Sequence, residues 1–177
     1  YWVFQRTRWN FSFFVAQEWL YASDKELDAA ANNRADGNKY WATIYQRLIK
    51  ANDERLDNVA NALKIQGRKL NLDNHDMASY VLSFVQHIPY KIPSNKLGLL
   101  APPQTVSEGY RDCDSKSLLY VLIMRKLEYD TVMCVDYRLR HAMAGVSTSS
   151  TGNYLTSRGI RYYFAETTVF GIRIGHM

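Results

Sequence analysis

Three residues in the second half of the chain carry the side chains of a thiol-based nucleophilic site. Cys113 lies in the segment YRDCDSKSLL, His141 opens the segment HAMAGV, and Glu166 lies in the segment YYFAETT. A thiol attacks carbonyl carbons, an imidazole accepts the thiol proton, and a carboxylate orients the imidazole. The sequence therefore indicates acyl transfer through a thioester, without naming a substrate.

The local patterns place each of these residues at the start of a helix or in a strand. A helix is predicted from about residue 114 to 126, with Asp112 and Asp114 at its start, where carboxylates cap a helix and favour its dipole. Strands are predicted over 131–139, 141–147 and 160–169. Because a helix N-terminus stabilises a thiolate, we expect a Cys113–His141 thiolate–imidazolium pair, oriented by Glu166. The charged neighbours of Cys113 argue against its deep burial.

These segments together resemble the transglutaminase-like superfamily, the papain-related thiol enzymes in which Cys, His and an acid follow in this order. The segment QHIPY at 86–90 is similar to the segment upstream of the Cys in bacterial members, and the resemblance runs from about residue 74 onward. It implies an α+β fold with a transglutaminase-like/papain-like core and the catalytic residues Cys113, His141 and Glu166. The acid here is Glu, where the superfamily more often has Asp.

The resemblance also implies Gln86 as an oxyanion-hole donor, beside the backbone N–H of Cys113. A place on the surface of a helix is the alternative for Gln86. The implied activity is that of a cysteine peptidase or amidase acting on a peptide or protein substrate. A protein transglutaminase, or a non-catalytic binding module that retains the fold, are the alternatives. No cofactor and no metal site are expected, since the chain has no Cys-x-x-Cys and no His pair at helical spacing.

Composition limits the remaining function classes. The chain has 177 residues with a net charge of +5, and no run of Lys and Arg is dense enough to predict nucleic-acid binding. No segment reaches the roughly 20 apolar residues of a membrane span. Cys134 lies in an apolar strand-like run, so we expect a buried free thiol. No signal peptide is visible. Because residue 1 is Tyr, we expect a fragment or processed form, which leaves room for further domains outside it. A periplasmic or secreted location is compatible with this, and the compartment stays open.

A single domain over 1–177 is predicted, with three parts: aromatic strands in 1–22, a helical part in 23–90 and a catalytic core in 91–177. In the first part, alternation of Trp9, Phe11, Phe13 and Val15 favours strands. In the second, a short helix over 23–31 precedes a long helix over about 39–66 that Gly67 ends, and a helix capped by Asp73 or Asn74 runs to Pro89. Residues 90–111 are predicted to be a loop that forms one wall of a substrate cleft, and 147–158 a polar hairpin loop.

Overall fold

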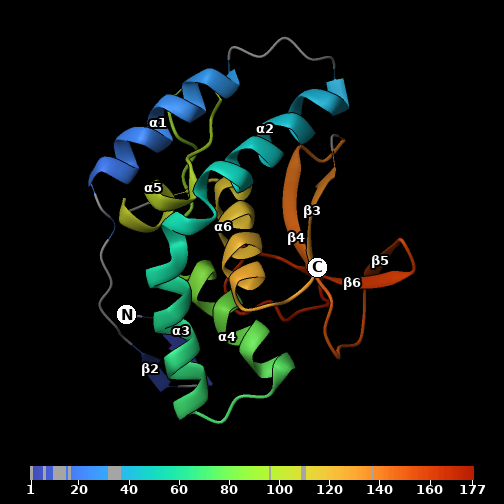
Figure 1. The fold of residues 1–177 in the computed structure, drawn as a ribbon. Coiled ribbons are helices and arrows are strands. Elements are labelled where there is room, and N and C mark those ends of the chain that lie inside the picture. Colours follow the sequence, from blue (N-terminus) through green and yellow to red (C-terminus); the bar gives the residue numbers. More distant parts are fainter. Residues whose placement is uncertain are drawn as a thin grey trace.

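The fold combines helices with an antiparallel sheet. The computed structural model (Figure 1) describes residues 2–5, 7–9, 15, 17–31, 37–95, 97–108, 111–136 and 138–177. In chain order the elements are β1 (Trp2–Phe4), β2 (Thr7–Trp9), α1 (Gln17–Ala31), α2 (Gly37–Asn52), a 3-10 helix (Glu54–Leu56), α3 (Asp57–Lys69), α4 (Asn74–Gln86), α5 (Pro102–Ser107), α6 (Cys113–Lys126), β3 (Thr131–Asp136), β4 (His141–Val146), β5 (Tyr154–Ser157) and β6 (Ile160–Ala165). Helices followed by antiparallel strands confirm the α+β class.

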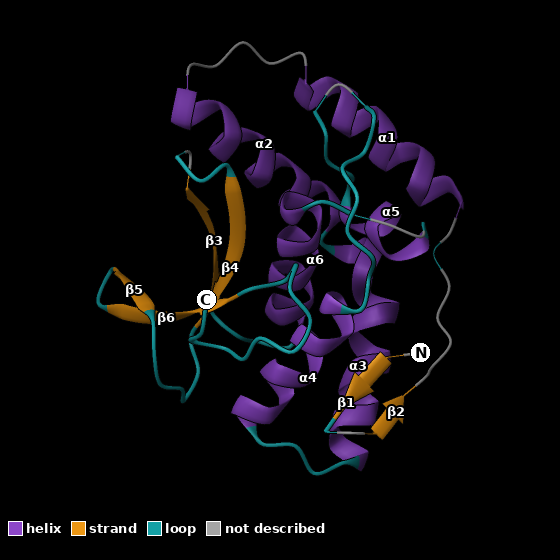
Figure 2. Cartoon of the chain, turned by 180° about the vertical axis from the view of Figure 1, so that it is seen from behind, coloured by secondary structure: helices purple, strands orange, loops and turns teal. Residues whose placement is uncertain are grey.

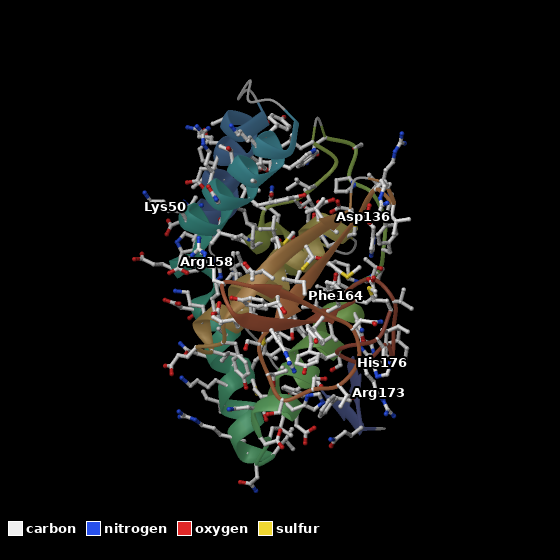
Figure 3. The ribbon with its side chains drawn as sticks, turned by 90° about the vertical axis from the view of Figure 1, so that its right-hand side faces the viewer. Lys50, Asp136, Arg158, Phe164, Arg173 and His176 are labelled. Atoms are coloured by element: carbon white, nitrogen blue, oxygen red, sulfur yellow. The ribbon has the colours of Figure 1, made fainter. Side chains whose placement is uncertain are left out.

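The sheet carries the strands predicted from the alternating pattern. Its order is β3-β4-β6-β5, all pairs antiparallel, with Ala144 of β4 opposite Ala165 of β6. The sheet lies on one side of α6, and α1, α3 and α5 lie on the other (Figure 1). Helix α2 extends across to β3, where Trp41 packs in one cluster with Val135. Figure 3 shows the sheet from its outer side, with Asp136 of β3 above Phe164 of β6 in this view. β4, which begins at His141, is therefore an inner strand that packs against α6.

Helix α6 is the central element of the core. Its residues from Leu118 to Met124 are all fully buried, as expected for a helix covered on every side. Leu119 to Met124 belong to a core shared with α3, α4, β4 and β6, and Leu118 belongs to a second cluster with residues of α1 and α2. Such a helix has little freedom to shift, because close-packed interiors yield poorly to displacement. The position of Cys113 at its first turn is consequently well fixed.

The N-terminal half departs from the sequence-based expectation in two places. Residues 2–4 and 7–9 form a small antiparallel hairpin, which lies beside α3 and α4 rather than in the main sheet (Figure 2). Its Phe4 ring contacts the Tyr80 ring of α4, with centroids 5.1 Å apart. Residues 17–21, expected to be strand, instead begin α1. The predicted strand positions Phe11 and Phe13 lie outside the described residues.

The predicted long helix over 39–66 is interrupted near residue 53. Helix α2 ends at Asn52, which is fully buried, and α3 begins after the 3-10 turn. The Asn52 side chain donates to the Leu48 carbonyl at 2.8 Å and accepts from the Ser23 hydroxyl at 2.7 Å and from Arg55 at 3.0 Å. Asn side chains that bond the backbone locally compete with helix continuation, and a buried position adds a reason to end the helix there.

Gly67 does not end α3, which continues to Lys69. A Cβ atom at Gly67 would lie 2.3 Å from the Met77 sulfur, so the glycine permits a close approach of α3 to α4. Helix α4 begins at the predicted cap, since the Asp73 side chain accepts from the Asp76 amide at 2.8 Å.

Two elements were missed in segments predicted to be loops. The short α5 begins after Ala101 with prolines in its first turn, where a missing N–H costs nothing. β5 is an exposed edge strand that pairs with β6. Because its side chains are mostly exposed, its sequence lacks the alternation of apolar and polar residues that predicts a strand. Among the described residues, no helix has the length and apolar character that crossing a bilayer requires.

Candidate functional site

Cys113 is the first residue of α6, as the sequence predicted. The Asp112 side chain caps the helix by accepting from the Ser115 amide at 3.1 Å, and it also accepts from the Ser115 hydroxyl. Asp112 is 4% exposed, and this burial raises the pKa of its carboxyl to about 6. The prediction that Asp112 caps the helix is confirmed.

His141 and Glu166 lie side by side because their strands are neighbours in the sheet. His141 opens β4, and Glu166 directly follows β6, which pairs with β4. The His141 Nε2 atom lies 2.6 Å from Glu166 Oε2. The other carboxylate oxygen, Oε1, accepts from the Thr168 amide at 2.8 Å and from its hydroxyl at 2.5 Å. The longer side chain of Glu therefore reaches the imidazole while its second oxygen is anchored.

The charge of Glu166 is supported by these hydrogen bonds. Burial raises the pKa of its carboxyl, but the hydrogen bonds from Thr168 and His141 outweigh burial, and the net pKa lies below its ordinary value. An ionised Glu166 that accepts from Nε2 leaves Nδ1 as the ring nitrogen able to accept a proton. The His141–Glu166 pair thus has the tautomer and the hydrogen bond that a general base with an orienting carboxylate requires.

Ser117 links the Cys113 face of α6 to the residues that follow His141 and Glu166 in the chain. Its hydroxyl donates to the Ala142 carbonyl at 3.2 Å and lies 3.1 Å from the Thr167 hydroxyl. Residues four apart on a helix share a face, so Cys113 lies one turn before Ser117 on the face that meets these neighbours of His141 and Glu166. A hydrogen bond with the Ala142 main chain also acts on the Cys113 thiol. The three residues predicted from the sequence therefore converge at one end of the α6–sheet interface.

The Cys113 thiol differs from the expected thiolate. Cys113 is 6% exposed, and burial, followed by the charges of Asp114 and Asp112, raises its pKa to about 11. Its thiol donates to Asp114 Oδ2 across 3.5 Å. The expectation that charged neighbours would keep Cys113 exposed is wrong, because Asp112 and Arg111 are themselves buried. The favourable helix terminus is opposed by two adjacent carboxylates.

Gln86 lies near the site, but its amide is occupied by main-chain partners. Its Nε2 donates to the carbonyls of Glu166 at 2.8 Å and Ile172 at 2.9 Å, and its Oε1 accepts from the Gly171 amide at 3.2 Å. A primary amide has two hydrogens, and both are used here. The predicted oxyanion donor therefore has no hydrogen left for an oxyanion in this arrangement. The helical-surface alternative fails as well, since Gln86 is only 7% exposed.

Lys116 is a further residue at the site that the sequence did not reveal. It is 1% exposed, and its ammonium donates to the carbonyls of Gln86 at 3.2 Å and Ile88 at 2.6 Å. Burial lowers the pKa of Lys116 to about 8, against the opposite effect of the Glu166 charge. Lys116 thereby joins α6 to the end of α4, next to the Gln86 side chain that holds the segment after Glu166.

A cavity of about 220 Å³ opens beside the His141 ring. Its other lining residues come from α2, the start of α6, β3 and the turn after β3: Trp41, Tyr45, Asp114, Val135, Asp136 and Arg140. Among the described residues, two larger cavities, of about 680 and 500 Å³, lie around α1–α2 and around the Leu127–Asp130 turn, and neither is lined by His141. The smaller cavity is therefore the one of these three that reaches the His141–Glu166 pair, through His141.

Tyr90, in the predicted cleft wall, lies near Cys113. The Tyr90 side chain is half exposed, and burial, followed by the nearby Cys113 and Asp112, raises its pKa. Main-chain hydrogen bonds join this segment to Arg111, from Lys91 N to Arg111 O and from Arg111 N to Pro89 O, both at 2.8 Å. Part of the segment 90–111 thus lies next to Cys113.

Only consecutive residues at the start of α6 bring possible metal-ligating atoms together in the described part of the chain. One atom each of Asp112, Cys113 and Asp114 lies within 4.8 Å of the others. Each of these side chains already has a protein partner: Ser115 for Asp112, Asp114 for Cys113, and the Tyr45 hydroxyl for Asp114. We assign no metal to this group.

Comparison of the chain with protein-family models, with curated proteins and with solved structures found no match. The functional interpretation consequently depends on the site itself.

Proposed function

We propose that this protein is a thiol-dependent acyl enzyme, most simply a cysteine peptidase or amidase with a transglutaminase-like core. The observation that supports this most is the 2.6 Å contact of His141 Nε2 with an anchored, ionised Glu166, at the end of the sheet that packs on the Cys113 face of α6. The proposal takes His141 as the proton acceptor for the Cys113 thiol, which lies at the first turn of α6 next to the Ala142 main chain.

In the proposed reaction, the Cys113 sulfur attacks the carbonyl carbon of a peptide or carboxamide. Because the thiol is protonated at rest, its proton passes to His141 Nδ1 as the S–C bond forms, and the Glu166 carboxylate stabilises the imidazolium. The same proton then goes to the leaving amine as the C–N bond breaks, leaving a thioester. The backbone N–H of Cys113 is the donor for the oxyanion, in place of Gln86. Water attacks the thioester and regenerates the thiol, and an amine in place of water would give transamidation.

The test is acylation by p-nitrophenyl acetate, followed by intact-mass and peptide mass spectrometry. The proposal expects a burst of nitrophenol with one acetyl group on Cys113, lost in Cys113→Ala. General acid–base catalysis contributes about 10²–10⁴ in rate, so His141→Gln should slow acylation by about that factor. Cys134, a free and half-buried thiol whose pKa burial also raises, is the internal control. Equal acetylation of both cysteines, or no effect of His141→Gln, would refute the proposal. A peptide-library screen then defines the substrate.

The raised pKa of Cys113 is the observation that favours the second candidate, a non-catalytic binding module that retains the fold. In that case the His141–Glu166 contact is structural. Such a protein shows no burst with p-nitrophenyl acetate, while a peptide selected from the same library binds without being cleaved.

A further inference from the structure

The cavity beside His141 has a lining that fits one kind of substrate group. Two carboxylates, those of Asp114 and Asp136, face it, together with the side chains of Trp41 and Tyr45. At about 220 Å³ it is smaller than the roughly 300–1,000 Å³ of pockets for whole small-molecule ligands. It therefore suits a single side chain of a longer substrate.

Asp136 is held in its charged form by the turn that follows β3. Its Oδ1 accepts from the Arg138 amide at 2.8 Å and from the Leu139 amide at 3.1 Å, and these bonds lower the pKa of its carboxyl. Its other oxygen lies 3.7 Å from the Arg138 guanidinium, whose side chain is 92% exposed, and an ion pair so open to water is weak. Asp136 can therefore attract a second cation.

The aromatic pair adds a surface that also favours a cation. The Trp41 and Tyr45 rings are stacked, with centroids 5.8 Å apart and planes 27° apart. The Tyr45 hydroxyl donates to Asp114 Oδ1, which fixes this carboxylate beside the rings. Faces of Trp and Tyr rings attract ammonium and guanidinium groups. Rings and carboxylates thus line one space next to the nucleophile.

Arg140 is the single cation among the lining residues, and it opposes this preference. It is exposed, and it lies in the turn between β3 and β4. With Asp114 and Asp136 charged, the lining carries one net negative charge, in a protein whose overall formal charge is +5. The acidic character is therefore local to this cavity.

We propose that the cavity binds the cationic side chain of a lysine or arginine residue in the substrate whose acyl group Cys113 attacks. This inference rests on the proposed function and names the substrate class of that site. An ammonium group in the cavity would place positive charge beside Asp114, the carboxylate that faces the Cys113 thiol at 3.5 Å. Binding the correct side chain would then also relieve the repulsion that disfavours the thiolate, so the nucleophile becomes reactive when the site is filled.

Affinity labels that differ only in one side chain test the selectivity. Acyloxymethyl ketones of Nα-acetyl-lysine, Nα-acetyl-norleucine and Nα-acetyl-glutamate are compared by the second-order rate of Cys113 modification. We expect the lysine label to react about tenfold faster than the norleucine label, which corresponds to about 1.4 kcal/mol. Asp136→Asn should remove most of this ratio, because Asn retains the oxygen that accepts from the turn but loses the charge. Arg140→Gln should increase the ratio.

The matched control is Asp57→Asn. Asp57 lies 3.0 Å from Lys126, at the opposite end of α6, so this change removes one carboxylate away from the cavity and should leave the ratio unchanged. The lysine and norleucine labels could modify Cys113 at equal rates, or the glutamate label could react fastest. Either result would overturn the inference. If the labelling still depends on His141, the proposed function would stand.

Binding without chemistry provides the independent readout. Subtracting the fluorescence of Trp41→Phe from that of wild type isolates the signal of Trp41. At low salt this signal should change saturably as Nα-acetyl-lysine methylamide is added, and it should not change with the norleucine amide. The response should be lost in Asp136→Asn. Equal fluorescence responses to both amides, or no response to either, would refute the inference, whatever the acylation assay shows. A missing nitrophenol burst together with intact binding of the lysine amide would refute only the proposed function.

Discussion

Removing the Gln86 side chain should destabilise the protein and loosen the site together. Gln86→Ala deletes three hydrogen bonds, two from Nε2 to the Glu166 and Ile172 carbonyls and one to Oε1 from the Gly171 amide. A buried polar group left without its partner costs about 1–3 kcal/mol, so the loss in free energy of unfolding should reach about 3 kcal/mol or more. For a chain of this size this lowers the melting temperature by about 6–12 °C.

Gln86→Met separates the hydrogen bonds from the space that the side chain fills. Met is close to Gln in length and shape but offers neither an N–H donor nor a carbonyl acceptor, so this variant should lose nearly as much stability as Gln86→Ala. Gln46→Ala, at an exposed position of α2, is the control for changing a helical Gln and should stay within about 0.5 kcal/mol of wild type.

Urea unfolding of the three variants gives the free energies, and acylation by p-nitrophenyl acetate gives the effect on the site. Because Gln86 holds the Glu166 carbonyl, its loss should also slow acylation, even at temperatures where the variant is fully folded. A Gln86→Met protein within 1 kcal/mol of wild type would refute the reasoning that these bonds stabilise the segment. Unchanged acylation in that variant would show that the segment keeps Glu166 in place without Gln86.

Three further predictions concern the start of α6 and the sheet. Asp114→Asn should speed iodoacetamide labelling of Cys113 at neutral pH, since the Asp114 charge raises the thiol pKa, while Cys134 in the same sample stays slow. The folded pKa of Asp112 is raised to about 6, above the unfolded value near 3.9, so its contribution to stability is present at low pH and falls between about pH 4 and 6. Thermal melts of Asp112→Asn across this range should lack that fall, although both proteins keep a capping oxygen. Gly145→Ala should cost about 1–3 kcal/mol by urea unfolding, because its Cβ would lie 2.8 Å from a side-chain methyl of the adjacent strand.

The elements that position the site were predictable because they depend on local signals. The acidic residues on either side of Cys113 mark the start of α6, and the strand-like patterns over 131–139, 141–147 and 160–169 mark β3, β4 and β6. The order Cys113, His141, Glu166 was sufficient to expect the contact between the last two, since neighbouring antiparallel strands bring their ends together.

What the sequence did not provide depends on burial and on distant partners. The break after Asn52 comes from contacts with α1, and Gly67 is explained by Met77 of the next helix. The charges around Cys113 indicated an exposed thiol, yet Arg111 and Asp112 are buried, and this reverses the expected pKa shift. Gln86 was placed near the site correctly, but its three partners lie about 80 residues further along the chain.

The Gln86 bonds also bear on the order in which the molecule folds. They close a chain of 80 to 86 residues, and contacts between segments so far apart are made late because their loop entropy must be overcome first. During synthesis, α6 and Cys113 are complete before Glu166 has been added. We therefore expect the nascent chain to carry an unassisted thiol, with the base oriented only after the last strand joins the sheet. Acyl-transfer chemistry would then be confined to molecules whose synthesis has passed residue 172.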